Sequence, residues 1–177
     1  MKKIILIFAT TAAPLLFVSA AFCQEQQSFK SAGSASAFIA SNDAKPPAGV
    51  STTEADVINT RALRFFNKDF KNAEDIKWYK LKDGFVSYCR INGNKNRVFY
   101  DQKGNCAGSI TYYNDKTMPK DLREIVKSVY YDYAITVVEE IHAAGKILFK
   151  VHIEDEKSWK IVDVTEGEIT IVTDFSK

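Results

Sequence analysis

Residues 85–101 read FVSYCRINGNKNRVFYD, and this stretch decides the fold. Apolar and polar residues alternate on both sides of Asn92-Gly93-Asn94, a pattern typical of two antiparallel strands joined by a tight turn. Similar turn residues stand on either side of the stretch, at 82–84 and 102–105. The sequence therefore predicts four antiparallel strands in a row: one around Ile76 and Trp78, then Phe85–Ile91, Arg97–Asp101 and Cys106–Tyr113.

A helix is predicted immediately before these strands. Ser51-Thr52-Thr53-Glu54 has the spacing of a capping box, in which side chains satisfy the first free backbone N–H groups of a helix. Apolar residues then recur at helical spacing and form one stripe, made of Ile58, Ala62, Phe65, Phe66 and Phe70.

The same order of elements begins again in the second half. Pro119 stands near a second predicted helix start, and the apolar stripe that follows consists of Leu122, Ile125, Val126, Val129 and Tyr133. Four more runs with strand character come after it: Ile135–Ile141, Ile147–Ile153, Trp159–Val164 and Glu168–Asp174.

The two halves match each other in sequence. Residues 147–163 read ILFKVHIEDEKSWKIVD, and at an offset of 62 residues six positions match: Phe85, Cys89, Ile91, Phe99, Tyr100 and Asp101 fall on Ile147, Val151, Ile153, Ile161, Val162 and Asp163. We predict a tandem repeat, with copies at 51–114 and 115–177. Since a lone copy would leave open sheet edges and one bare face, the expected fold is α+β: one eight-stranded antiparallel sheet with both helices on one face. The opposite face is then left for function.

The first 23 residues have the features of a secretory signal peptide. Met1-Lys2-Lys3 is basic, an apolar stretch follows, and the small residues within Ser19–Cys23 are typical of a cleavage site. Cleavage after Cys23 and cleavage after Ala21 both remain open. Two threonines and a proline make the stretch a poor membrane anchor, and Phe22 does not fit a lipid-attachment site at Cys23. We predict a periplasmic or secreted protein with a flexible spacer at 24–50 and one domain at 51–177.

The charge balance narrows the choice of partner. The chain has 24 Lys and Arg against 22 Asp and Glu, but Lys2 and Lys3 lie in the predicted signal peptide, which leaves 22 of each sign. A neutral protein has no electrostatic footprint for nucleic acid or for an anionic membrane surface. We expect neither partner, and no membrane span after processing.

Two cysteines remain after the predicted signal peptide, Cys89 and Cys106. An even number of thiols in an exported protein favours a disulfide. The predicted meander, however, puts a third strand between them, which sets their backbones about 10 Å apart and beyond the reach of a bridge. We expect two unbridged cysteines, with Cys89 buried; a nucleophilic Cys89 is the alternative.

Metal and catalytic readings have little support in the sequence. His142 and His152 lie near Glu139, Glu140, Glu154 and Asp155 on neighbouring predicted strands, but pairing through a turn at Ala144-Gly145 offsets the two imidazoles. Residues 101–105 lack the ligand pattern of a calcium loop and predict a hairpin turn instead. Known nucleophile and phosphate-loop motifs are absent from the sequence. We expect no cofactor, no metal and no enzyme activity.

Three segments together resemble a known family. They are Val98–Gly104 (VFYDQKG), Met118-Pro119 at a helix start, and Val129–Ile135 (VYYDYAI) entering a strand, and they are similar to the PepSY-like family of exported bacterial proteins. The resemblance covers residues 66–175, although Tyr131-Asp132 stands where the family has a proline. It implies a fold like that of β-lactamase inhibitor protein, and a non-enzymatic binding or inhibitory module whose relatives hold protein partners on the concave sheet face.

The residues predicted to bind lie on the face away from the helices. If Phe85, Cys89 and Ile91 face the helices, Tyr88 and Arg90 face the other way, and Tyr100 and Tyr112 are expected to join them from the next strands. Tyrosine and arginine are over-represented in protein-binding surfaces, although the same residues also cover ordinary two-sided sheets.

Three functions therefore remain open. The leading one is a module that binds an envelope or extracellular protein or peptide through this sheet face. The first alternative is a small envelope hydrolase or metal-dependent enzyme that uses His142, His152 or Cys89. The second is a structural accessory protein that associates with itself through exposed strand edges such as Glu168–Asp174.

Overall fold

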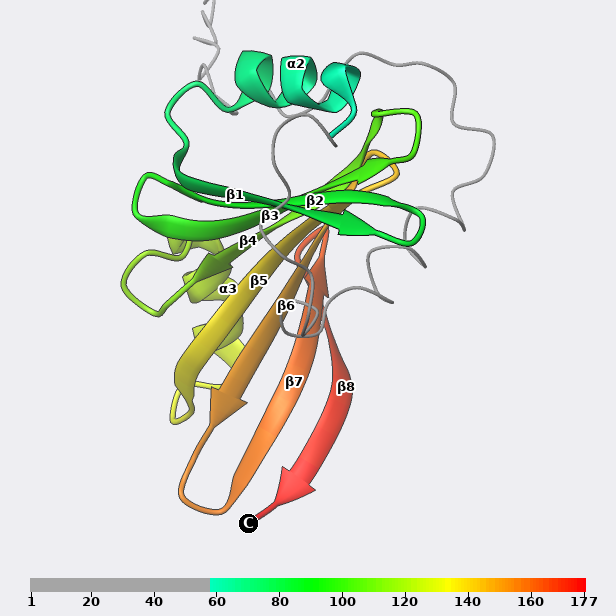
Figure 1. Ribbon diagram of the computed structural model, residues 1–177. Coiled ribbons are helices and arrows are strands. Elements are labelled where there is room, and N and C mark those ends of the chain that lie inside the picture. The colour runs from blue at the N-terminus through cyan, green and yellow to red at the C-terminus, as the bar shows by residue number, and fades with distance from the viewer. Residues whose placement is uncertain (1–57) are drawn as a thin grey trace, which may run out of the picture.

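The structure, a computed structural model, describes residues 58–177, which form one open antiparallel sheet of eight strands and two helices (Figure 1). The strands lie side by side in chain order, so the fold is α+β. The predicted signal peptide, the spacer and the capping box at 51–54 lie outside the described residues. The elements are α2 (Thr60–Asp69), β1 (Glu74–Leu81), β2 (Gly84–Ile91), β3 (Asn94–Asp101), β4 (Cys106–Tyr113), α3 (Lys120–Val129), β5 (Ala134–Ala143), β6 (Lys146–Glu154), β7 (Ser158–Thr165) and β8 (Glu168–Ser176).

Both helices differ at one end from the sequence prediction. Ile58 precedes α2, because the side chain of Asn59 accepts a hydrogen bond from the backbone N–H of Arg61 at 2.9 Å and caps the helix there. The stripe predicted for α3 runs too far, since the helix ends at Val129 and Tyr133 lies beyond it. Tyr133 packs against the same core from the connection to β5, which is why it matched the helical spacing.

Tight turns connect most neighbouring strands, as the sequence predicts. Asn92-Gly93 joins β2 to β3 with both residues at positive φ, 52° and 80°, which is the backbone of a type I′ turn. Ala144-Gly145 and Glu166-Gly167 have nearly the same pair of φ values. These turns fix which residues face each other across the strands, and therefore which side chains share a face.

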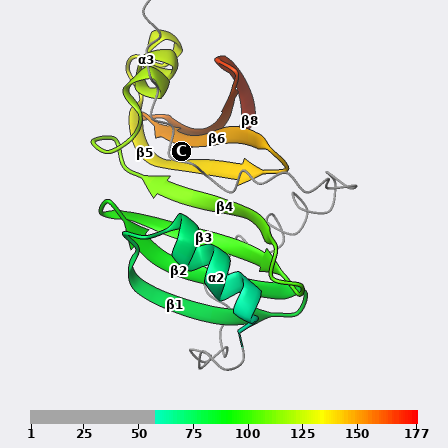
Figure 2. The same ribbon diagram turned by 90° about the horizontal axis from the view of Figure 1, so that it is seen from above.

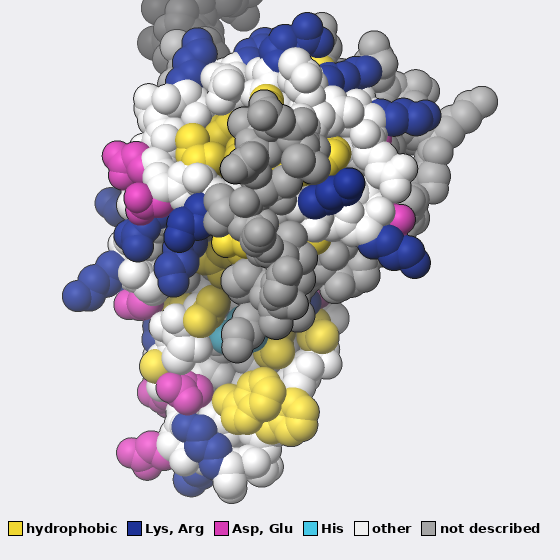
Figure 3. Space-filling view, viewed as in Figure 1, with side chains coloured by type: hydrophobic (Ala, Val, Ile, Leu, Met, Phe, Trp, Pro, Cys, Tyr) yellow, Lys and Arg dark blue, Asp and Glu magenta, His cyan; other side chains and the backbone are white. Residues whose placement is uncertain are grey.

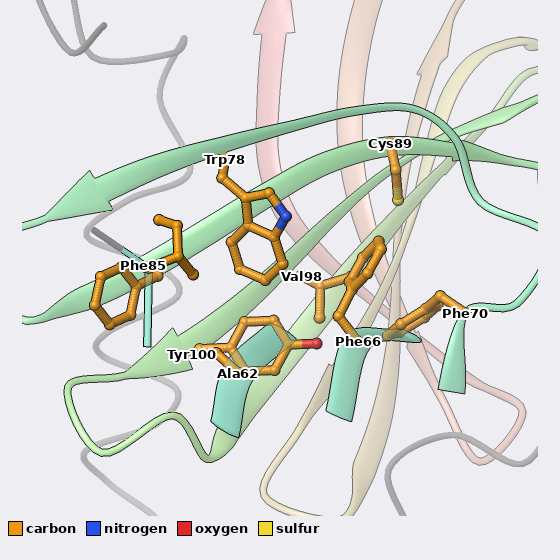
Figure 4. Packing of buried hydrophobic residues seen from close by; sticks show 9 residues of the cluster. Ala62, Phe66, Phe70, Trp78, Phe85, Cys89, Val98 and Tyr100 are labelled. Carbon is orange, nitrogen blue, oxygen red and sulfur yellow. The ribbon is translucent and has the colours of Figure 1, made fainter. Parts of the chain in front are cut away.

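Two separate cores hold the helices on the sheet. Under α2, the buried side chains of Ala62 and Phe66 pack on β1, β2 and β3 against Trp78, Phe85, Cys89, Val98 and Tyr100 (Figures 2 and 4). Under α3, Leu122 and Val126 pack on strands β5 to β7 against Val138, Val151, Ile153, Val162 and Val164. Among residues 58–177, neither helix is long and apolar enough to cross a membrane.

Candidate functional site

A third buried cluster lies on the side of the sheet away from α2. It consists of Val86, Phe99 and Ile110, each at most 1% exposed, and it contains no helix residue. Val86 follows Phe85 and Phe99 follows Val98, and both preceding residues belong to the α2 core. Since successive side chains of a strand point to opposite sides, Val86 and Phe99 point away from α2. Tyr79, Tyr88, Tyr112 and Ile141 pack around this cluster. We call this side of the sheet the Tyr88 face.

Three tyrosines and one arginine form the centre of the Tyr88 face. The guanidinium of Arg97 lies 5.2 Å from the ring centroid of Tyr88 and 5.1 Å from that of Tyr112, so it stands between two rings. Tyr79 meets Tyr88 edge to face at 5.2 Å. Such cation–π and aromatic contacts hold the side chains in place, and a surface built in this way loses little conformational entropy on binding.

Of the four residues predicted to bind, Tyr88, Arg90 and Tyr112 lie on this face. Arg90 pairs with Lys95 across β2 and β3, and Lys95 in turn pairs with Tyr112. The side chain of Arg90 is 51% exposed and its Nε lies 3.3 Å from the carboxylate of Asp75, which is itself 71% exposed. Salt bridges as exposed as this one contribute little to stability. The role of these residues in binding stays a prediction.

The placement predicted for Tyr100 is wrong. Tyr100 is fully buried under α2, where its ring centroid lies 5.5 Å from that of Trp78 (Figure 4). The cause is the register of the hairpin: the Asn92-Gly93 turn places Tyr100 directly opposite Phe85, a residue that packs under α2. Residues directly opposite each other in a sheet share a face. Counting outward from the two-residue turn would therefore have placed Tyr100 on the same face as Phe85.

The Tyr88 face continues across the second half of the sheet. Ile110 pairs with Ile141, which pairs with Leu148, and on the same side of β6 His152 pairs with Ile161 of β7. Two residues from Ile161, the ring of Trp159 stacks on that of Phe175 with centroids 4.3 Å apart and an interplanar angle of 18°.

Trp159 and Phe175 are the large aromatic residues that this face exposes most among those the structure describes, at 37% and 48%. Figure 3 shows hydrophobic side chains gathered over β7 and β8, near the C-terminal end of the chain. Sequence reasoning did not single out either residue. The pairing of β7 with β8 could have indicated this pair, because it brings Trp159 directly opposite Phe175.

The two histidines do not come together. His142 pairs with Ile147 and His152 with Val137, as the turn at Ala144-Gly145 predicts. His142 lies on the same side of β5 as the α3 core residue Val138, whereas His152 lies on the Tyr88 face, so the metal site built on both is wrong. Among residues 58–177, no group of three His, Cys, Asp or Glu side chains is placed to hold a metal ion.

His142 instead belongs to a polar network of β4 and β5. The Tyr113 hydroxyl donates to Glu140 at 2.6 Å, and the second carboxylate oxygen of Glu140 lies 2.6 Å from Nε2 of His142. Burial alone would raise the pKa of Glu140, but the hydrogen bonds from His142 and Tyr113 outweigh it and lower that pKa. Burial, together with the neighbouring carboxylate, raises the pKa of Tyr113. These contacts therefore favour the ionised form of the Glu140 carboxylate.

The lowered pKa of Glu140 makes a prediction about acid stability. Because the folded pKa lies below the unfolded one, the network stabilises the fold at neutral pH and this contribution is lost as the pH falls through the folded value. We expect Glu140→Gln to lower the free energy of unfolding by about 1–2 kcal/mol at pH 7. We also expect it to reduce the fall in stability over the range from pH 7 to acid pH below 4.5, the ordinary pKa of a glutamate. Urea unfolding of both proteins across this range measures the difference, and parallel pH curves would contradict it.

The cysteines are unbridged, as predicted. Cys89 lies on β2 and Cys106 on β4, with β3 between them, and both are free thiols. Burial raises the pKa of Cys89 to about 11 and outweighs the neighbouring Ser87 side chain, which acts to lower that pKa. A thiol with so high a pKa is protonated at neutral pH and is a poor nucleophile, which gives the alternative role of Cys89 no support.

Solved structures with the same fold come from Bacteroides. A BLIP-like protein from B. fragilis is 20% identical, with a TM-score of 0.55 over 67% of this chain and 86% of that one. A DUF2874 family protein from B. ovatus is 12% identical, with a TM-score of 0.54 over 69% and 89%. A candidate periplasmic protein from B. eggerthii is 14% identical, with a TM-score of 0.53 over 67% and 88%. These likenesses show a BLIP-like fold. No family model and no curated protein matches the sequence.

Proposed function

We propose that this protein is an exported, non-enzymatic binding module that presents the Tyr88 face to a protein or peptide partner in the periplasm or outside the cell. The observation that carries the proposal is the face itself: ordered aromatic side chains at its centre and a stacked, exposed Trp159–Phe175 pair at its end. Tyrosine, tryptophan and arginine are the residues on which binding energy concentrates in protein interfaces.

The side opposite the Tyr88 face is occupied by packing. We infer that both helices lie on that side. Val98 of the α2 core pairs with Ser109 of β4, and Tyr113, four residues later on the same side of β4, pairs with Val138 of the α3 core. With the helices covering one side, the Tyr88 face is the broad surface that remains for a partner.

Corresponding features in the two halves support the inference that the domain arose by duplication. The helices are each ten residues long and end with nearly identical dihedral angles at Phe70 and Tyr130. The pairing of β3 with β4 shifts between Phe99 and Tyr100, and the pairing of β7 with β8 shifts 62 residues later, between Ile161 and Val162. The Tyr88 face would then be formed from two related halves.

The names of the structural neighbours fit the proposal in part. One neighbour is named as BLIP-like and another as a candidate periplasmic protein. Membership of the PepSY-like family and export through the predicted signal peptide are further parts of the proposal, and they rest on the sequence.

Site-specific photo-crosslinking in the exporting cell tests this function. A photoreactive phenylalanine is placed at Tyr88, at Trp159 or, as a control, at Arg64, which is exposed on α2. The proposal predicts the same discrete crosslinked protein or peptide from the first two positions and none from Arg64. Crosslinks from α2 alone, or equal products from all three positions, would refute the Tyr88 face as the binding surface.

A further inference from the structure

We propose that copies of this protein associate end to end, with β8 of one copy pairing with β1 of the next. This inference goes beyond the proposed function, and it rests on the duplication inferred above. β1 and β8 are the two ends of the sheet, and within the part of the chain that the structure describes each pairs with one strand (Figure 1). The outer side of an edge strand presents backbone N–H and C=O groups with which a further strand can pair.

The sheet already contains one junction of this kind. β4, the last strand of the first half, pairs with β5, the first strand of the second half. If the halves correspond, the outer edge of β8 corresponds to the edge of β4 that meets β5. The outer edge of β1 then corresponds to the edge of β5 that meets β4. The two ends of the sheet are therefore the two sides of a junction that the same chain forms internally.

The internal junction also predicts the register between two copies. Gly108 of β4 and Thr173 of β8 take the same place, directly beside the irregularity in the pairing with the preceding strand. Ala143 of β5 and Leu81 of β1 also correspond, since each is the last residue before a two-residue turn. Because Gly108 pairs with Ala143, we expect Thr173 to lie opposite Leu81 of the next copy.

This register brings two aromatic side chains together on the Tyr88 face. Two residues along from the first pair, Phe175 comes opposite Tyr79 of the next copy. Phe175 is 48% exposed, and Tyr79 packs around the buried cluster of the Tyr88 face in its own copy. The corresponding pair of the internal junction is Ile110 with Ile141, which is an apolar contact on the same face. Aromatic pairs directly across two strands stabilise a sheet in the same way.

The pair between these two has opposite charges. Asp174 comes opposite Lys80, which is exposed. Asp174 already forms an ion pair with Lys160 of its own copy, but its side chain is 51% exposed and can accept a second cation. Opposite charges directly across two strands are favourable. The register is unfavourable only at the last residue, where Lys177, itself in an ion pair within its own copy, comes opposite Lys77.

Charge favours this pairing over the pairing of two β8 strands. Glu168–Ser176 contains two acidic residues and no basic one, so two β8 edges would offer each other only negative charge. β1 supplies Lys77 and Lys80 in the part that the register uses. A contact between two different edges leaves one β1 and one β8 edge at the ends of each assembly. Such a contact continues into a chain or closes into a ring.

Cysteine crosslinking tests the register. In a Cys106→Ser background, which removes the half-buried native thiol, Lys80→Cys is made in one preparation and Asp174→Cys in another. Directly opposed residues of antiparallel strands lie within reach of a disulfide. After oxidation with diamide, the mixture is expected to give a crosslinked dimer, and either preparation alone about a tenth as much or less. The matched control replaces Asp174→Cys by Ser176→Cys, two residues along the same side of β8, and should crosslink about fivefold less.

Sedimentation measures the mode of association. Between about 1 μM and about 1 mM, the average mass of the unmodified protein is expected to rise beyond that of a dimer. Lys80→Glu puts a like charge opposite Asp174 and should weaken the association about fivefold or more. The matched control, Lys95→Glu, makes the same change of charge on the internal strand β3 and should leave the association within about twofold.

Four results would overturn this inference. They are a protein that stays monomeric over the whole range, a mass that levels off at a dimer, crosslinking of Asp174→Cys alone as strong as that of the mixture, and equal weakening by Lys80→Glu and Lys95→Glu. None of these results bears on the binding proposed for the Tyr88 face, because crosslinks from Tyr88 and Trp159 to a partner are measured separately.

Discussion

Replacing Phe66 by Ala is expected to lower the free energy of unfolding by about 3–5 kcal/mol. Phe66 is 1% exposed and joins α2 to the sheet: its ring centroid lies 5.1 Å from that of Phe70 and 5.3 Å from that of Trp78. Removing the ring leaves a cavity between the helix and β1–β3 that rigid strands cannot close. A domain of this size has a total stability of only about 5–15 kcal/mol, so the loss is severe.

Urea unfolding followed by tryptophan fluorescence measures this effect, because Trp78 lies in the same cluster. Phe65→Ala is the matched control, since Phe65 is the preceding residue, is half-buried, and carries Arg61 over its ring at 5.4 Å. We expect it to cost no more than about half as much. Equal losses at the two positions would mean that α2 is not docked as described.

The second large effect concerns binding. Trp159→Ala is expected to weaken the affinity for the partner recovered by crosslinking by about 2 kcal/mol or more, which is about a thirtyfold change in Kd. Trp159 is already partly exposed, and among residues 58–177 it stacks on the ring of Phe175 alone, so the same substitution should change the stability of the free protein by about 1 kcal/mol or less.

Titration calorimetry with the purified partner measures the loss of affinity. Tyr131→Ala is the control, since Tyr131 is 75% exposed in the connection between α3 and β5 and belongs to neither the Tyr88 face nor a core cluster. We expect this variant to bind like the wild type. Equal weakening by both substitutions would show that loss of any exposed aromatic residue disturbs the protein, and would remove the argument for the stack.

Most of the fold was predictable because short-range chemistry specifies it. The Asn92-Gly93 turn and its counterparts at Ala144-Gly145 and Glu166-Gly167 adopt the positive φ values that two-residue hairpins need. When apolar and polar residues alternate along the strands between such turns, few arrangements other than an antiparallel meander bury the apolar side chains. The open eight-stranded antiparallel sheet and its two helices agree with that expectation.

The helix ends were less predictable because tertiary packing imitates helical spacing. Ile58 lies just before α2 and packs in its core, and Tyr133 lies after α3 and packs in the other core. Both residues therefore matched a helical stripe without being helical. Where a helix begins or ends depends on local hydrogen bonds, such as the one at the start of α2 that Arg61 donates to Asn59, and apolar spacing does not reveal them.

The candidate surface was predictable only where the register was certain. Tyr88 and Tyr112 were assigned to the correct side, but Tyr100 was not, although the turn at Asn92-Gly93 pairs it with Phe85. The Trp159–Phe175 stack depends on the pairing of β7 with β8, which contains an irregularity between Ile161 and Val162. Alternation alone cannot tell which face the side chains beyond such an irregularity take, because one extra residue moves all of the following side chains to the other face.

Hydroxyl-radical footprinting of the protein with and without its crosslinked partner tests the central claim most directly. The proposal predicts that oxidation of Tyr88, Trp159 and Phe175 slows in the complex, while oxidation of Phe65 on α2 and of Tyr131 stays unchanged. Protection of Phe65 or Tyr131 with none at Tyr88 and Trp159 would contradict the claim that the partner binds the Tyr88 face.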